Sequence, residues 1–291
     1  MDLGYYPGCS LQQSSSLYDI QNRLIFNNIG IDLKEIEDWN CCGATSAGKT
    51  DDFMSIAMPA RNIGIAGAQG IKEMVIPCSA CYSRTLIAQN VLKTSQNMKN
   101  KINSELSEKI NGDVKISSIL EVLLSAIEKG LFAKKITQKL SLLKPVCYYG
   151  CMMTRFPYDI HVPDDIENPV GMEKILKAVK IQTIDWNYKT ACCGASATVN
   201  DHQTAMNLMG KIINDAVARG ANCMIVTCPM CQLNLDAHQD TFCEQNNIKE
   251  RLPVFFITEV LGMAMGLGFK QLQIDRHFIK GEQLFEELEQ I

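Results

Sequence analysis

The chain has 291 residues, of which 46% are hydrophobic and 21% charged, a balance typical of folded soluble proteins with room for two modest domains. A net charge of −4 and a pI near 5.7 exclude a strongly basic nucleic-acid-binding surface. The N-terminal residues do not form a secretory signal, and the apolar stretch 254–269 is too short and too interrupted to cross a bilayer. We therefore expect a cytoplasmic protein.

The first part of the chain alternates cysteine motifs with regular elements. GYYPGCS at 4–10 is followed by a segment with Leu17, Leu24 and Ile25 at helical spacing. NCCGATS at 40–46 precedes a predicted helix over 51–70, and the acidic Asp51 and Asp52 suit its N-terminal end. KEMVIPC at 72–78 reads as a short apolar strand that ends at a cysteine.

A polar and then amphipathic segment follows, which we expect to be a helical connector over 95–144. Beyond it come CYYGCM at 147–152, ACCGASA at 191–197, a predicted helix over 201–221 and a predicted strand over 222–228 that leads into VTCPMCQL. The tail, 271–291, has the pattern of an amphipathic helix whose apolar residues need a partner surface.

The three cysteine blocks recur in the same order and at similar spacing, which indicates a tandem duplication. From Cys42 to Cys78 there are 35 intervening residues, and from Cys193 to Cys228 there are 34. We predict an α/β protein made of two related repeats, 1–94 and 145–270, each a small parallel-sheet half. Because ligand sites in such sheets collect at the carboxyl ends of strands, we expect pseudo-two-fold symmetry with the cysteines at a shared face.

Thirteen cysteines in a reducing compartment indicate metal or redox chemistry, because structural disulfides are rare there. Each repeat supplies five of them within its blocks. A tetrahedral zinc site closes with four ligands, and adjacent side chains of an extended segment point to opposite sides. A cluster of several irons therefore suits the pattern best, with zinc or a thioredoxin-like CxxC redox pair as alternatives. The ten expected ligands are Cys9, Cys41, Cys42, Cys78, Cys81, Cys151, Cys192, Cys193, Cys228 and Cys231.

A single cysteine, a CC pair followed by glycine and a CxxC motif, present twice, resembles the pattern of the CCG-domain proteins. The resemblance covers about residues 3–268. In having no fused ferredoxin or flavoprotein module, the chain resembles the B subunits of heterodisulfide reductases from methanogenic archaea. Fumarate, succinate, lactate and glycolate oxidoreductases carry related subunits.

The resemblance implies two noncubane 4Fe–4S clusters, one per repeat, each bound by the five cysteines of its set. It implies reduction of the mixed disulfide of coenzyme M and coenzyme B, held between the clusters, to two thiols. The implied partners are a ferredoxin-like C subunit and a flavin-containing A subunit, working with a hydrogenase or formate dehydrogenase. The alternatives are a CCG subunit of another oxidoreductase, such as thiol:fumarate reductase, and a non-enzymatic, zinc-stabilised scaffold.

Residues 43–50, GATSAGKT, match the phosphate-loop pattern G-x-x-x-x-G-K-[ST]. A phosphate loop follows a buried apolar strand, but here the lead-in KEIEDWNCC is polar and acidic. In the second repeat Val199 and Asn200 stand where Gly48 and Lys49 would be needed. We therefore predict that this segment belongs to the thiol site and does not hydrolyse nucleotides.

Several residues beside the cysteine blocks are candidates for the anionic groups of such a disulfide and for proton transfer. Lys49, Arg84 and Arg155 could bind a sulfonate or a phosphate, and His202 could protonate a departing thiolate. For each of the four, an ordinary exposed role is the alternative.

The other notable side chains have simpler predicted roles. The tyrosine pairs at 5–6 and 148–149 are expected to pack around the clusters. Three cysteines without repeat partners are expected to be small buried side chains, and three histidines outside the blocks to be structural. These are Cys147, Cys223 and Cys243, and His161, His238 and His277.

Overall fold

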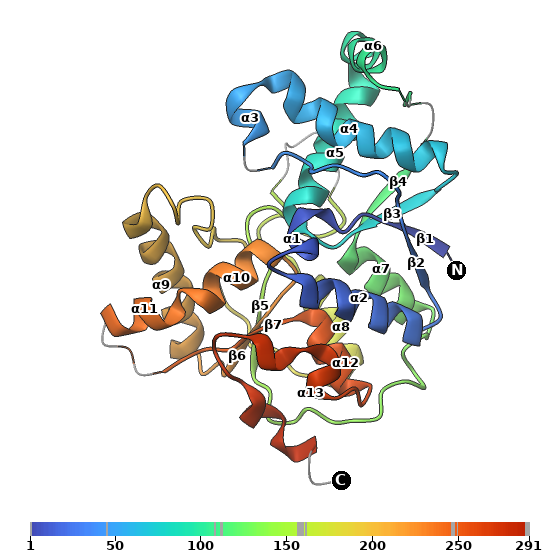
Figure 1. Ribbon diagram of the computed structural model, residues 1–291. Helices are drawn as coiled ribbons and strands as arrows, with labels where there is room; N and C mark the ends of the chain where they lie inside the picture. The colour runs from blue at the N-terminus through green and yellow to red at the C-terminus, as the bar shows by residue number, and fades with distance from the viewer. Residues whose placement is uncertain are drawn as a thin grey trace.

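The computed structural model describes residues 2–44, 46–107, 109–110, 113–155, 160, 162–245, 248 and 250–288. It has two α/β halves that lie side by side, each built on its own parallel sheet (Figure 1). His161 lies outside the described residues.

The first sheet contains β1 (Asp2–Tyr5), β2 (Asp32–Glu35), β3 (Glu73–Ile76) and β4 (Lys115–Ser118), in the order β2-β1-β3-β4. All its strand pairs are parallel. The chain moves outward from β1 to β2, then returns to the other side of β1 to form β3. This reversal creates a switch point between β1 and β3, where ligand sites of open α/β sheets form.

The second sheet contains β5 (Pro145–Tyr148), β6 (Cys223–Val226) and β7 (Val254–Phe256), in the order β5-β6-β7. Its pairs are also parallel, and an isolated bridge from Val146 to Ile184 stands in the place that β2 has in the first sheet. The second half therefore repeats the connection order of the first, with its switch point between β5 and β6. The predicted fold, two related parallel-sheet halves, is confirmed.

Helices predicted from periodicity are present in the first half. Asp51 caps α4 by accepting hydrogen bonds from the amides of Phe53 and Met54, which are otherwise unpaired at a helix start. Pro59 lies inside this helix. The helices of this half are α1 (Gly8–Gln12), α2 (Ser16–Asn28), α3 (Ala47–Thr50), α4 (Asp52–Ala68), α5 (Ser79–Thr94), α6 (Gln96–Glu105) and α7 (Ile119–Glu128).

In the second half the predicted long helix is α9, and a short helix begins directly after Cys228. Pro229 occupies the first position of that helix, where its missing amide proton costs nothing. The helices are α8 (Gly171–Ala178), α9 (His202–Ala218), α10 (Pro229–Ala237), α11 (Gln239–Gln245), α12 (Ile257–Ala264) and α13 (Phe269–Leu272).

The prediction of a helical connector over 95–144 needs correction, because this segment also supplies β4 and α7 to the first half. In the second half, β7 and α12 are the corresponding elements. In both helices a glutamate accepts a hydrogen bond from the amide three residues earlier, Glu121 in α7 and Glu259 in α12. The first half thus continues past residue 94 to the end of α7. The segment KISS is too short and too polar to have been recognised as a strand.

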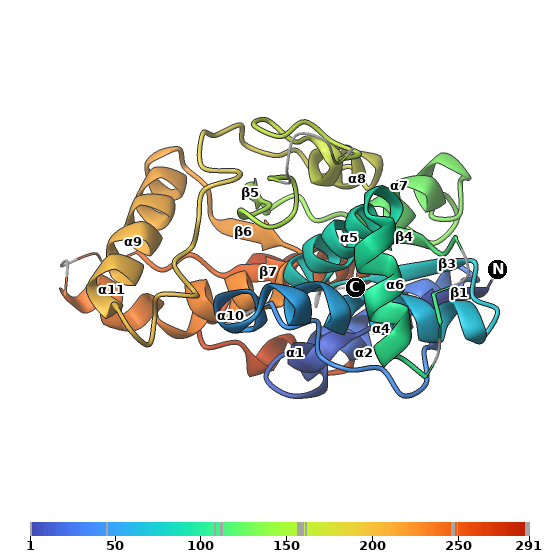
Figure 2. The ribbon, with the colours of Figure 1, turned by 90° about the horizontal axis from the view of Figure 1, so that it is seen from above.

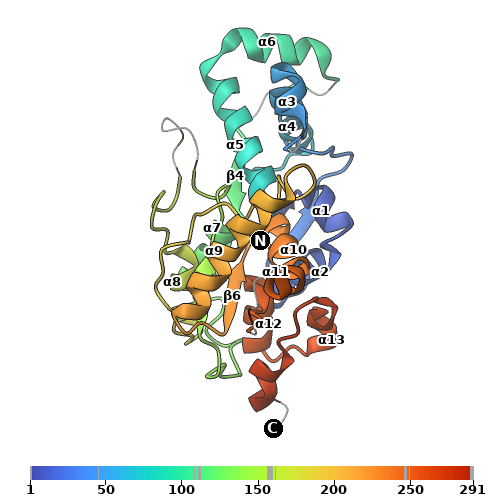
Figure 3. The same cartoon turned by 90° about the vertical axis from the view of Figure 1, so that its left-hand side faces the viewer.

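The prediction of an amphipathic α-helix in the tail is also wrong. The chain instead forms two 3₁₀ segments, η1 (Ile274–Arg276) and η2 (Glu282–Leu288), at the opposite end of the molecule from α6 (Figure 3). Gly281 lies between them, where a Cβ would come within 2.5 Å of Phe255. The expected partner surface is present, since Phe285 is buried with its ring edge-on to Phe255 and Phe269.

A buried polar network joins the two halves. The Glu259 carboxylate in α12 accepts hydrogen bonds from Gln21 of α2 and from the amide of Phe256, and it lies 2.8 Å from His277 Nε2. Thr258 donates to the same Gln21 side chain. Burial opposes a charge on His277, but the neighbouring carboxylate prevails and raises its pKa. His277 is therefore structural, as predicted, and helps fix one half against the other.

Replacing Glu259 with alanine should destabilise the protein by about 3–5 kcal/mol, because it leaves several buried donors unpaired. The free energy of unfolding in denaturant measures this loss. The control is Glu167→Ala, which removes an exposed ion pair with Arg155 and should cost less than about 1 kcal/mol. Equal losses in the two variants would contradict a bridging role for Glu259.

Candidate metal centre

The five thiols of the first set come together at the switch point of the first sheet. Cys9 lies in α1, directly after β1, and Cys78 is the N-cap residue of α5, directly after β3. Cys81 lies in the first turn of α5, and Cys41 and Cys42 come from the loop that precedes α3. A helix start favours negative charge, so α5 suits thiolates at its N-terminus.

The second set repeats this placement. Cys151 follows β5, Cys228 is the N-cap residue of α10 directly after β6, and Cys231 lies in the first turn of α10. The adjacent pair, Cys192 and Cys193, lies in the loop that precedes α9.

Contacts within each set are also duplicated. The sulfurs of Cys42 and Cys81 lie 3.2 Å apart, and those of their counterparts Cys193 and Cys231 lie 3.5 Å apart. After each CC pair a glycine amide, that of Gly43 or Gly194, donates to the sulfur two residues earlier at 3.4 Å. The duplication read from the sequence thus extends to individual hydrogen bonds.

Crowding sets the protonation of these thiols in the same way in both halves. Cys9 shares a hydrogen bond with Cys41, which raises the pKa of Cys9, while hydrogen bonds from Cys42 and Cys9 lower the pKa of Cys41. In the second set, Cys192 raises the pKa of Cys151, and the reciprocal bond lowers the pKa of Cys192 to about 6. Since one thiol of each pair opposes ionisation of the other, full ionisation requires a compensating positive charge.

The two sets meet through Cys78 and Cys228. A hydrogen bond to Cys228 raises the pKa of Cys78, whereas bonds from Cys231 and Cys78 lower the pKa of Cys228. Helices α1 and α10 pack against each other beside this contact, as Figures 1 and 2 both show. We call the region around Cys78 and Cys228 the junction.

A tyrosine and a glycine support each set. Tyr6 donates to the carbonyl of Asn40, and Tyr148 donates to that of Ala191, in each case the residue before the CC pair. A Cβ on Gly8 or Gly150, both at positive φ, would lie 2.9 or 3.0 Å from the sulfur of the last cysteine in its set. Glycine is therefore required where the backbone passes that sulfur.

Two of the four tyrosines predicted to surround the clusters face elsewhere. The Tyr5 hydroxyl accepts a hydrogen bond from Asn22, and that of Tyr149 donates to Glu173. Cys147, Cys223 and Cys243 are buried outside the two sets, as predicted.

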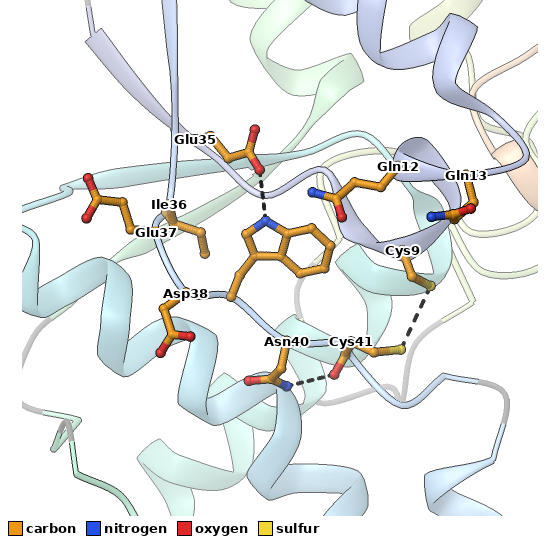
Figure 4. A pocket seen from close by; sticks show the side chains of 10 residues that line it. Cys9, Gln12, Gln13, Glu35, Ile36, Glu37, Asp38, Asn40 and Cys41 are labelled. Atoms are coloured by element: carbon orange, nitrogen blue, oxygen red, sulfur yellow. Dashed lines mark hydrogen bonds between the residues drawn. The ribbon is translucent and has the colours of Figure 1, made fainter.

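The first set is open to solvent through a cavity of about 700 Å³ lined by Cys9, Gln12, Trp39 and Cys41. Figure 4 shows Cys9 and Cys41 facing each other at one side of it, with their sulfurs 3.9 Å apart. Cys9 is exposed, whereas its counterpart Cys151 is partly covered. The two sets are therefore alike in their contacts and different in their access.

The predicted cations fall into two places. Arg84, one turn after Cys81, has its guanidinium beside Gly48, whose Cβ would lie 3.4 Å from Nη2, and its buried Nε has no hydrogen-bond partner among the described residues. Lys49, which follows Gly48 in the sequence, is exposed. Arg155 lies in the second half, where it donates to Thr190, two residues before Cys192.

His202 is exposed at the start of α9, with its ring 6.3 Å from that of His238. The structure describes no contact between His202 and a thiol of either set. Its proposed proton transfer stays a prediction from sequence.

The GATSAGKT segment lacks the context of a phosphate loop. The strand before it, β2, ends at Glu35, and the CC pair separates the two. Gly48 instead leaves room for the guanidinium of Arg84.

No three or more His, Cys, Asp or Glu side chains among the described residues are set to hold a metal ion as they stand. A single zinc ion needs its thiolates about 2.3 Å from one point, whereas a multinuclear centre spreads them over several metals. The donor chemistry, five converging thiols in each set, suits the second case.

In the part of the chain that the structure describes, no helix is long and apolar enough to cross a membrane.

Comparison with known proteins agrees with this arrangement. The family model CCG, described as a cysteine-rich domain, matches residues 3–84 and 146–236. The chain belongs to this CCG family, and it carries the domain twice.

Relatives of nearly the same length are components of oxidoreductases. The chain is 30% identical to the 8-methylmenaquinol:fumarate reductase membrane anchor subunit of Wolinella succinogenes, over 97% of this chain and 99% of that protein. It is 24% identical to the B subunit of the ferredoxin:CoB-CoM heterodisulfide reductase of Methanosarcina mazei, over 99% and 97%. The predicted likeness to heterodisulfide reductase B subunits is thus confirmed.

A crystal structure of a hypothetical protein from Helicobacter pylori shares the fold. Its TM-score is 0.72 at 12% identity, and the match covers 96% of this chain and 52% of that one. This chain therefore spans about half of that structure.

Gly194→Ala should be more destabilising than Gly220→Ala, although both residues have nearly the same positive φ, 83° and 82°. The left-handed backbone costs either alanine about 1–2 kcal/mol. Only at Gly194 would the Cβ also collide with the backbone of α9, 2.8 Å from the Cα of Ala205, adding about 1–3 kcal/mol. Denaturant unfolding compares the variants, and equal losses would show that the CC loop is not held against α9.

Proposed function

We propose that this chain is the catalytic iron–sulfur subunit of an oxidoreductase complex that reduces the mixed disulfide of coenzyme M and coenzyme B to two thiols. The observation that carries the proposal is that two matched five-thiol sets adjoin, because α1, which holds Cys9 of the first set, packs on α10, which begins directly after Cys228 of the second. Reducing a disulfide takes two electrons and two protons, RSSR′ + 2e⁻ + 2H⁺ → RSH + R′SH. Two adjacent one-electron centres suit that requirement.

Each set would bind one noncubane 4Fe–4S cluster, which supplies electrons one at a time when bound. The two deep CxxC motifs would hold the clusters at the junction, and the CC loops would close over them, fixed by the amides of Gly43 and Gly194. Buried thiols exclude water from this region, while Cys9 keeps one side accessible. The proposed ligands are Cys9, Cys41, Cys42, Cys78, Cys81, Cys151, Cys192, Cys193, Cys228 and Cys231.

The anionic groups of the disulfide would be bound by cations at the edges of the two sets. Arg84 and Lys49 serve the first set and Arg155 the second. The unpaired Nε of Arg84 supports this role, because a buried guanidinium nitrogen without a partner is costly until an anion arrives.

Electrons would come from a ferredoxin-like C subunit and a flavin-containing A subunit, supplied by a hydrogenase or formate dehydrogenase. The cavity beside Cys9 and Cys41 is where such a partner would come nearest to the first set. A cytoplasmic location stays a prediction from sequence.

A second candidate is an iron–sulfur subunit of a fumarate reductase complex. The 30% identity with the Wolinella protein, against 24% with the Methanosarcina mazei protein, favours it. The complex should be purified without oxygen and assayed with the mixed disulfide and with fumarate as separate acceptors. Turnover of fumarate alone would overturn the disulfide proposal and support the second candidate.

Anaerobically purified protein should contain about eight irons and eight acid-labile sulfides per chain, as two 4Fe–4S clusters require. Cys42→Ala and Cys193→Ala should each lower that content to about half, since each removes a thiolate from one set. Cys223→Ala is the control, because Cys223 is buried outside both sets and its loss should leave iron unchanged. Zinc without iron or sulfide in the wild type would support the scaffold alternative instead.

Arg84→Met should raise KM for the mixed disulfide about tenfold or more with little change in kcat, because it removes a charge-assisted contact worth about 1.5–3 kcal/mol. Lys49→Met should have a smaller effect, since Lys49 is exposed. Arg219→Met is the control, as Arg219 is paired with Asp215 at the far end of α9. An unchanged KM in Arg84→Met would remove this residue from the substrate site.

A further inference from the structure

Tyr18 of α2 is fully buried, and its hydroxyl has no hydrogen-bond partner among the described residues. Buried phenols normally have one, and an unpaired hydroxyl costs about 1–3 kcal/mol. Tyr6, Tyr82 and Tyr148 follow the rule, since their hydroxyls donate to Asn40, Glu121 and Ala191. The Tyr18 hydroxyl is therefore an exception that needs a physical reason.

The ring of Tyr18 is held firmly in place. It stacks on Phe256, the last residue of β7, with ring centroids 3.9 Å apart and planes within 7° of parallel. Helix α2 packs on α12, which begins at the next residue, and Gln21 one turn further along α2 bonds to Glu259. The hydroxyl cannot turn toward solvent without breaking this packing.

The hydroxyl is placed at the junction. Phe256, on which the Tyr18 ring stacks, pairs with Val226 in the second sheet, and Cys228 follows Val226 by two residues. Burial raises the pKa of Tyr18, and the charges of Cys228, Cys78 and Glu259 add to the rise. Glu259 already accepts bonds from Gln21, Phe256 and His277. The phenol therefore lies at the carboxyl end of the second sheet, near Cys228, where its hydroxyl has a hydrogen to donate.

We propose that Tyr18 is a positioning residue of the junction, whose hydroxyl donates a hydrogen bond to the thiolate sulfur of Cys78 or Cys228 when the clusters are bound. The inference rests on the function proposed above. A donor to a ligand sulfur stabilises the more negative, reduced state, because the added electron increases charge on that sulfur. Tyr18 would thereby make electron transfer into the junction more favourable.

Among the described residues between Cys151 and α8 no helix corresponds to α1, which holds Cys9 in the first half, or to α2, which follows it.

The test compares Tyr18→Phe with the matched control Tyr82→Phe in the anaerobically purified full chain. Both remove only a buried hydroxyl, but that of Tyr82 bonds to Glu121 in α7. Iron and sulfide are counted first, and the clusters are then titrated with a reductant while electron paramagnetic resonance is recorded. Tyr18→Phe should keep wild-type iron and shift the one-electron equilibrium about tenfold toward the oxidised state, equal to about 59 mV. Tyr82→Phe should leave that equilibrium unchanged.

The outcomes separate this inference from the proposed function. Wild-type iron and sulfide with an unchanged equilibrium in Tyr18→Phe would overturn the role of Tyr18 and leave the function standing. Equal shifts in both variants would show a general effect of lost buried hydroxyls and would also overturn it. A wild type without iron would overturn both.

Discussion

The approach of Cys78 to Cys228 is the constraint on which the rest of the arrangement depends. Two thiolates about 4 Å apart repel by about 4 kcal/mol at an effective dielectric constant of 20, and each set brings five sulfurs together. Such crowding is stable only if most thiols stay protonated or a cationic centre compensates them. Both sheets position their cysteines in the same way. Each places one cysteine after the strand on one side of its switch point and a CxxC motif, at the start of a helix, after the strand on the other side.

The two halves are alike at the junction and different around it. The network of Gln21, Glu259 and His277 fixes α2 of the first half against α12 of the second, so that the distance between Cys78 and Cys228 is set by a packed interface. Away from the junction, the first set borders a large cavity and the second is more covered. A rigid contact between the sets, with access from one side, suits a path along which electrons enter at one set and act between both.

Much of this was readable from the sequence because thiol ligands depend on residue identity at fixed spacing. The CC and CxxC blocks located both sets, and apolar periodicity located α2, α4, α9, β3 and β6. The strand β4 was missed since KISS carries no apolar alternation, and the tail was misassigned because Gly281 interrupts a helical pattern. Tyr18 could not be found this way, since it lies outside the repeated blocks and its significance depends on a missing partner in the folded chain.

The difference between the halves also bears on what the junction can accept. Ten cysteines on a common fold are compatible with several acceptors, and the relatives include proteins named for fumarate and for heterodisulfide reduction. Selection must then come from side chains at the edges of the sets. Arg84 and Lys49 lie close in sequence to cysteines of the first set. The second repeat has Val199 and Asn200 in the segment that corresponds to Gly48 and Lys49, and its nearby cation is Arg155, which donates to Thr190. A disulfide with two different anionic arms would present a different anion to each set, and unlike cations at the two edges suit such a substrate.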